Sequence, residues 1–158
     1  MNNHFGLTDY RSELYVRVLR CWVIVKYLSH NRNLEKILTL QKAAFIDYLL
    51  NNHSLLQECL LKFGKNHQTG NFQPVLYRDN MEYGDAQSVQ EFLKTTLILR
   101  EAGYIEMERR EVDIYLSPSI LEIDLSTELT SQWIITLELI KPLLSKSISL
   151  LQKSILGE

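Results

Sequence analysis

Apolar residues recur three or four positions apart in four stretches of the chain, a spacing typical of helices that bury one face. The predicted helices span residues 10–27, 34–51, 55–63 and 86–102. We expect Asn33 and Asp85 to cap the second and fourth of them, because short polar side chains accept hydrogen bonds from free helix N–H groups. Gly64 and Gly103 follow the third and fourth helices and are typical of helix ends.

The pattern changes to strict alternation after Gly103. Ile105 and Met107 alternate with charged residues, and Val112, Ile114 and Leu116 alternate with Asp113 and Tyr115. This period of two predicts a two-stranded hairpin with one buried face. Because its turn contains no glycine, we expect a turn that is longer or looser than the two-residue type.

Helical spacing returns in the last part of the chain, where we expect a long helix from Ser126 or Thr127 to about Ile155. Pro142 lies inside it and should kink it or divide it in two. Its main apolar stripe comprises Leu129, Trp133, Leu137, Ile140, Leu144, Ile148, Leu151 and Ile155.

The order of these elements is that of a winged-helix domain, with the hairpin as the wing. The sequence therefore predicts a mainly α fold with a small β-hairpin. Residues 1–118 would form the winged-helix-like domain, and residues 119–158 a helical tail that packs on the domain or on a partner. Residues 64–85 form a connection long enough to suggest a function of its own.

The tail carries more apolar surface than one face of a helix needs. One interpretation is that a partner protein covers part of it; the other is that the whole tail folds back on the first helices. The residues predicted to contact a partner are Trp133, Leu137, Ile140, Leu144, Ile148, Leu151 and Ile155, with Phe72 and Tyr77 in the long connection.

Charge separates the uses of a winged helix, which binds DNA in some proteins and only protein in others. The 158 residues have a net charge of −2, and residues 86–118 alone hold four basic and six acidic side chains. Phosphate contact requires a positive surface. Lys94, Arg109 and Arg110 are the candidates for such contact, and direct sequence-specific DNA binding is the weaker interpretation.

The sequence offers no catalytic constellation. The four histidines stand at no metal-ligand spacing, and no phosphate-binding or nucleophile motif occurs. We expect Cys21 and Cys59 to be buried, reduced thiols, and Asp47 either to pair with a buried arginine or to face solvent. We therefore predict no enzyme activity, no cofactor and no metal.

A polar N-terminal segment and the lack of any run of ~20 apolar residues predict a cytoplasmic protein that does not span a membrane.

Three segments resemble one known family, namely residues 15–20 (YVRVLR), residues 33–50 (NLEKILTLQKAAFIDYLL) and residues 101–105 (EAGYI). They are similar to segments of the middle components of ABC-three-component systems, bacterial anti-phage assemblies that include the Lamassu type. The resemblance implies a small non-catalytic winged-helix subunit that bridges an SMC-like ATPase and an effector protein. It supplies no binding residues, because the matching positions are mainly core positions.

Two function hypotheses follow. The first is an adaptor subunit of a multi-protein complex, whose partners are the SMC-like ATPase and the effector subunit. The alternative is a winged-helix transcription regulator that binds DNA as a dimer, and the isolated chain would then be a homodimer. An enzyme or toxin would need a catalytic constellation that the sequence lacks.

Overall fold

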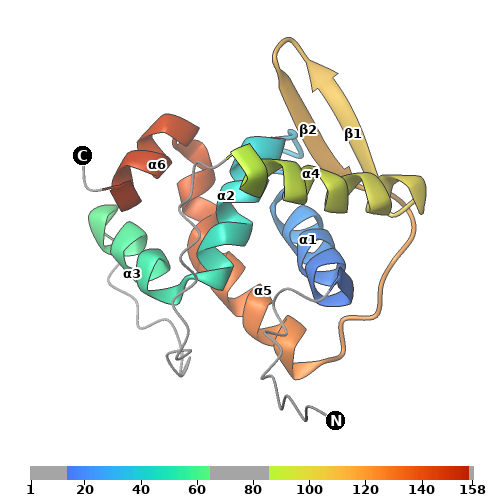
Figure 1. Cartoon of the computed structure of the whole chain (residues 1–158), viewed down its shortest axis with the longest axis horizontal. Helices are drawn as coiled ribbons and strands as arrows, with labels where there is room; N and C mark the ends of the chain where they lie inside the picture. Colours follow the sequence, from blue (N-terminus) through green and yellow to red (C-terminus); the bar gives the residue numbers. More distant parts are fainter. Residues whose placement is uncertain (1–13, 65–85, 157–158) are drawn as a thin grey trace, which may run out of the picture.

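The computed structural model describes residues 14–64 and 86–156. It is mainly helical with one small antiparallel hairpin, as the sequence predicts (Figure 1). The elements run in the order α1 (Leu14–Leu28), α2 (Leu40–Asn51), α3 (His53–Lys62), α4 (Ala86–Glu101), β1 (Ile105–Arg110), β2 (Asp113–Pro118), α5 (Glu128–Ile140), the 3-10 helix η2 (Lys141–Ser145) and α6 (Ile148–Leu156).

Helix α2 begins at Leu40, so the predicted start at residue 34 with Asn33 as its cap is wrong. Leu34 has a φ of 62°, which a continuing helix does not allow. Thr39 is the cap instead, because its hydroxyl accepts a hydrogen bond from the Lys42 N–H at 3.3 Å.

Residues 36–39 lie beside the hairpin. The Leu116 N–H donates to the Leu38 carbonyl at 2.9 Å, and Thr39 forms a bridge with Tyr115. The hairpin is thereby fixed to the start of α2 as well as to the end of α4.

Strands β1 and β2 pair from Ile105 opposite Pro118 to Arg110 opposite Asp113. Two residues, Glu111 and Val112, therefore form the turn, and the expectation of a longer or looser turn is wrong. Glu111 takes the left-handed conformation, with a φ of 54°, that a tight hairpin turn needs and that glycine usually supplies.

The tail is divided at Pro142, one of the two outcomes that the sequence allows. Helix α5 begins where the sequence predicts, directly after Thr127. The Thr127 hydroxyl caps it by accepting from the Thr130 N–H at 3.3 Å. Proline fits the first turn of η2, where a backbone N–H is not needed.

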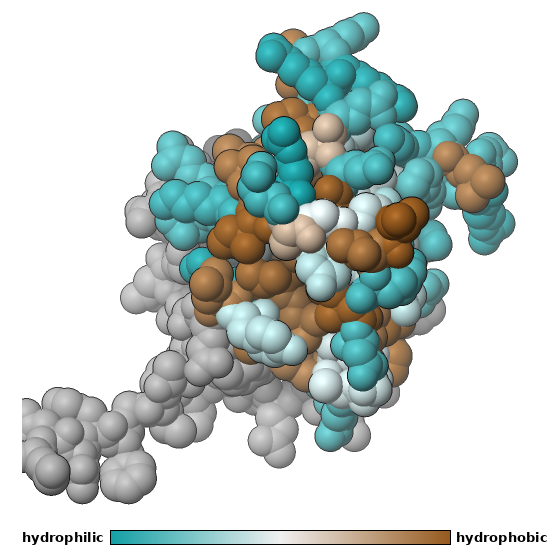
Figure 2. All heavy atoms as spheres, turned by 90° about the vertical axis from the view of Figure 1, so that its right-hand side faces the viewer, coloured by the Kyte–Doolittle hydropathy of each residue, from teal (hydrophilic) through white to brown (hydrophobic). Residues whose placement is uncertain are grey.

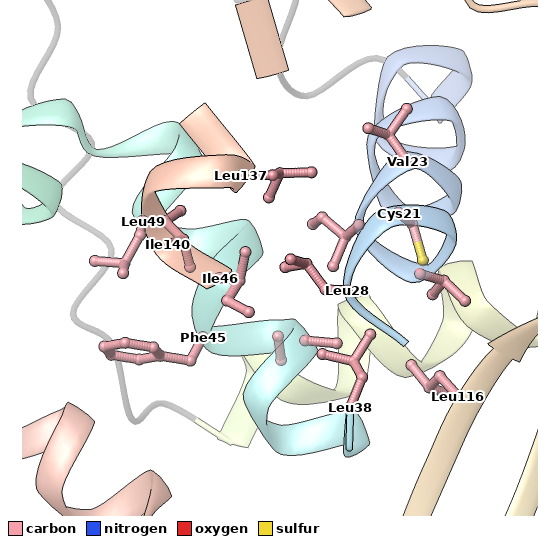
Figure 3. Packing of buried hydrophobic residues seen from close by; sticks show 14 of the residues in the cluster. Cys21, Val23, Leu28, Leu38, Phe45, Ile46, Leu49, Leu116, Leu137 and Ile140 are labelled. Carbon is pink, nitrogen blue, oxygen red and sulfur yellow. The ribbon is translucent and has the colours of Figure 1, made fainter. Parts of the chain in front are cut away.

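Helix α5 packs against α1 and α2, and α6 packs against α3. Figure 3 shows Leu137 and Ile140 of α5 among side chains of the first two helices, including Leu28 and Ile46. Polar contacts reinforce the packing: the Lys42 ammonium donates to the Leu144 carbonyl at 2.7 Å. The tail is therefore part of one continuous core.

Candidate protein interface on α4 and the wing

Helix α4 is held in place by its inner face. Phe92, Thr95, Thr96 and Leu99 are buried there, where α4 packs against α1 and α2. The Thr96 hydroxyl donates to the Leu93 carbonyl, so its burial leaves no unpaired hydroxyl. The opposite face of α4 is thus fixed toward solvent.

That solvent face is aliphatic in its centre. Leu97 and Ile98 are 38% and 45% exposed, and the exposed side chains of Lys94 and Glu101 flank them along the helix. A DNA-reading helix presents hydrogen-bond donors and acceptors to base edges at such positions. Two adjacent aliphatic side chains suit contact with protein better.

The lysine of this face is already paired. The Lys94 ammonium lies 2.9 Å from a carboxylate oxygen of Glu91, and the Arg17 guanidinium lies 3.7 Å from the other oxygen. The hydrogen bond from Lys94 lowers the pKa of Glu91. Both cations near the start of α4 therefore share one acidic neighbour.

A second charged network occupies the wing. Glu108 accepts from Arg110 at 2.9 Å and from Lys36 at 2.7 Å. These two hydrogen bonds lower the pKa of Glu108 to about 2, and the one from Arg110 has the larger effect. The Arg110 guanidinium also lies over the Tyr115 ring, 5.2 Å from its centroid, which is within range of a cation–π contact. The wing arginine is thus held by its own hairpin.

Arg109 is exposed near the tip of the wing, where its guanidinium donates to the Glu111 carbonyl at 3.4 Å. Beside it Val112 is 90% exposed. Among the residues that the structure describes, Arg109 and Arg100 form no ion pair. Of the four basic side chains between residues 86 and 118, two are thus tied to glutamates and two are without an ion pair in the described part of the chain.

The structure does not bring the three predicted nucleic-acid contacts together as one basic patch. Lys94 lies on α4, whereas Arg109 and Arg110 lie at the far end of β1. Lys94 and Arg110 are both tied to glutamates.

The predicted partner-contact stripe of the tail is covered by the chain itself, so that interpretation is wrong for its buried members. Ile148 and Ile155 are half-buried against the same core. Phe72 and Tyr77 lie outside the described residues. The stripe residues buried in the core are Trp133, Leu137, Ile140, Leu144 and Leu151.

An exposed apolar segment that sequence reasoning left unassigned joins β2 to α5. Ile120 is 95% exposed and Leu121 is 44% exposed. Ser119 anchors the segment, because its N–H donates to the Tyr104 carbonyl and its hydroxyl to the Gly103 carbonyl. Figure 2 shows hydrophobic residues gathered across the middle of the face that carries this segment and α1.

From the sequence alone, residues 120–125 are ambiguous between a strand and a helix, although four of the six are apolar. The exposure of this segment could not be predicted, because it depends on where Ser119 attaches it.

The buried thiols are as predicted: Cys21 and Cys59 are free and buried. Burial raises the pKa of each thiol, and at Cys59 a hydrogen bond from Ser154 partly offsets this. Within residues 14–64 and 86–156 no group of three or more metal-ligating side chains is found. No helix in this part of the chain is long and apolar enough to cross a bilayer.

Comparisons with protein-family models, with curated proteins and with solved structures found no match to this chain.

Proposed function

We propose that this protein is a non-catalytic, cytoplasmic adaptor subunit that binds other proteins through the α4 and wing side of its winged-helix-like domain. One observation carries the proposal: the solvent face of α4, which would read DNA in a DNA-binding winged helix, presents Leu97 and Ile98 next to Glu101. Aliphatic and acidic side chains favour a protein partner over a phosphate backbone.

The pairing of basic side chains supports the same proposal. To contact phosphate, Arg110 would have to leave both Glu108 and the Tyr115 ring. Lys94 would have to leave Glu91. Each exchange offsets part of the gain from a new phosphate contact, and the acidic neighbours that remain would repel the backbone.

The family resemblance of the sequence suggests which proteins the adaptor joins. We propose that it bridges an SMC-like ATPase and an effector in a bacterial anti-phage assembly of the ABC-three-component type. The exposed segment with Ile120 and Leu121 is a surface on which one of these partners would dock, since scattered single apolar residues need no partner but adjacent ones favour one.

Co-purification tests the adaptor proposal. The tagged full chain is expressed together with the products of the genes beside its own, and the proteins retained with it are identified. We expect a large ATPase to be retained by the wild-type chain and lost from the Ile120→Asp variant. The matched control is Leu61→Asp, since Leu61 is 59% exposed on α3, away from the wing. Retention of no neighbouring protein by the wild-type chain contradicts the proposal.

A gel-shift titration of duplex DNA at low salt tests the alternative. We expect no retardation by the wild-type chain. Retardation that weakens steeply with added salt, and that Lys94→Ala or Arg109→Ala reduces, would favour the transcription-regulator interpretation instead.

A further inference from the structure

The exposed stripe of α4 carries opposite charges at its two ends. Lys94 stands three residues before Leu97, and Glu101 stands three residues after Ile98. Positions i, i+3, i+4 and i+7 line one side of a helix. The stripe therefore has a cation at one end, an anion at the other and an aliphatic pair in the centre.

A second α4 running in the opposite direction would complement this stripe. With a twofold axis between positions 97 and 98, Lys94 of each copy faces Glu101 of the other, and the two aliphatic pairs meet at the axis. Such an interface is isologous, the commonest kind in homo-oligomers. A parallel arrangement would instead place like charges side by side.

We propose that α4 is a homodimerisation helix, and that the occupant of its solvent face is a second copy of this chain. The proposal rests on the proposed function only in that α4 contacts protein rather than DNA. A second copy is then the protein bound at α4, and the other partners bind at the wing and at the segment with Ile120 and Leu121, of which the dimer would present two copies.

The neighbours of the stripe permit this exchange of partners. The Lys94–Glu91 pair is a surface pair three residues apart, of the kind that is weak because solvent screens it. Glu91 keeps Arg17 as a neighbour when Lys94 turns to the second copy. Within the described residues, Glu101 forms no ion pair that would compete.

The size of the stripe predicts the strength of the dimer. Lys94 and Glu101 are separated by about 10 Å along the helix axis, at a rise of about 1.5 Å per residue. A stripe this short is expected to form a small interface, and small interfaces are typical of weak complexes rather than of stable ones, which bury ~1,200 Å² or more. We therefore expect a dimer that dissociates in the micromolar range and is seen only in concentrated samples.

Charge exchange tests the proposal. Sedimentation velocity and light scattering of the full chain, over concentrations that span the micromolar range, give the dimer dissociation constant. We expect Lys94→Glu and Glu101→Lys each to weaken dimerisation about tenfold or more, because each brings like charges together. The double variant restores opposite charges and should return the constant to within about threefold of wild type.

A matched control separates this contact from a general charge effect. Glu106→Lys changes an exposed acid on β1, outside the stripe, and should leave dimerisation unchanged. Circular dichroism melting curves establish that each variant is folded.

A wild-type chain that stays monomeric throughout overturns the proposal, as does a double variant that fails to recover. A monomer that still retains its neighbouring proteins in co-purification overturns the dimer while leaving the adaptor function in place.

Discussion

Arg20 of α1 donates from its Nε atom to a carboxylate oxygen of Asp47 on α2 at 2.5 Å. Arg20 is 2% exposed, and its guanidinium also lies 5.9 Å from the centroid of the Trp133 ring of α5. One buried cation thus joins three helices. Of the two roles that the sequence left open for Asp47, this is the pairing with a buried arginine.

Removal of the Asp47 carboxylate should be costly. Asp47→Ala leaves the buried guanidinium without its anion, and breaking a buried pair from one side typically costs about 3–5 kcal/mol. We expect a loss at the lower end of that range, because the Asp47 side chain is 20% exposed. Urea unfolding followed by circular dichroism measures the change.

The Arg20→Met variant provides the control for that measurement. When Arg20 is replaced by an apolar side chain of similar length, no buried charge remains, so Asp47→Ala should cost much less in this background. An equal cost in both backgrounds would mean that the ion pair contributes nothing to the effect.

Helix α5 offers a matched pair of substitutions that tests its place in the core. Leu137 is 1% exposed and Ile135 is 64% exposed. Leu137→Ala should cost about 2–5 kcal/mol of unfolding free energy through lost contacts and a cavity. Ile135→Ala should stay within about 0.5 kcal/mol of wild type. Similar effects of the two substitutions would contradict the packing of α5 on α1 and α2.

Two glycines with left-handed φ values differ in their surroundings. Gly103 has a φ of 83°, and a Cβ added there would meet Leu121 Cδ1 at 3.3 Å. Gly64 has a φ of 73° and nothing within 4 Å of such a Cβ. Alanine at either position should cost about 1–2 kcal/mol for the backbone conformation.

Gly103→Ala should cost more than Gly64→Ala, because the Leu121 side chain must also give way. Urea unfolding of the two variants measures the difference. Equal costs would mean that Leu121 moves freely, and a smaller cost at Gly103 would contradict the tight contact between α4 and the segment that follows β2.

The sequence predicted the elements whose signals are local. Gly103 follows the end of α4 in a left-handed conformation, and Thr127 caps the start of α5. Both roles depend only on residues close by in the sequence. The helix prediction for residues 34–39 was wrong because contacts other than apolar spacing decide their conformation. Their apolar spacing fits a helix, but the Asn31 side chain accepts hydrogen bonds from the N–H groups of Asn33 and Glu35. Pairing with β2 then holds the rest of this segment extended.

The sequence analysis placed the partner contacts on the tail and the long connection, not on α4 and the wing. The net charge of α4 and the wing is readable from sequence, and so is the presence of Lys94 and Arg110. The sequence does not show which glutamate pairs with each of these cations. Glu108, for example, also accepts from Lys36, which is 72 residues away along the chain. The tail stripe was misassigned because spacing shows that a face is apolar but not what covers it.

Acid should weaken the wing as the pH falls below about 4.5, although Glu108 itself is protonated only at a lower pH than an ordinary surface carboxylate. The pKa of Glu108 is about 2 in the folded chain, below its ordinary value of 4.5, chiefly because Arg110 and then Lys36 donate to it. A group whose pKa is lowered on folding contributes stability above its unfolded pKa, and that contribution is lost as the pH falls from about 4.5 toward about 2. Carboxyl chemical shifts recorded by NMR across this range should place the midpoint of Glu108 near the lower limit.

The Glu108→Gln variant removes this titration while keeping the shape of the side chain. Its free energy of unfolding should therefore fall less between pH 4.5 and pH 2 than that of the wild type. Glu106→Gln, an exposed position on the same strand, serves as the control and should follow the wild-type profile. If Glu108→Gln and wild type lose stability in parallel over this interval, the hydrogen bonds from Arg110 and Lys36 do not stabilise the folded wing.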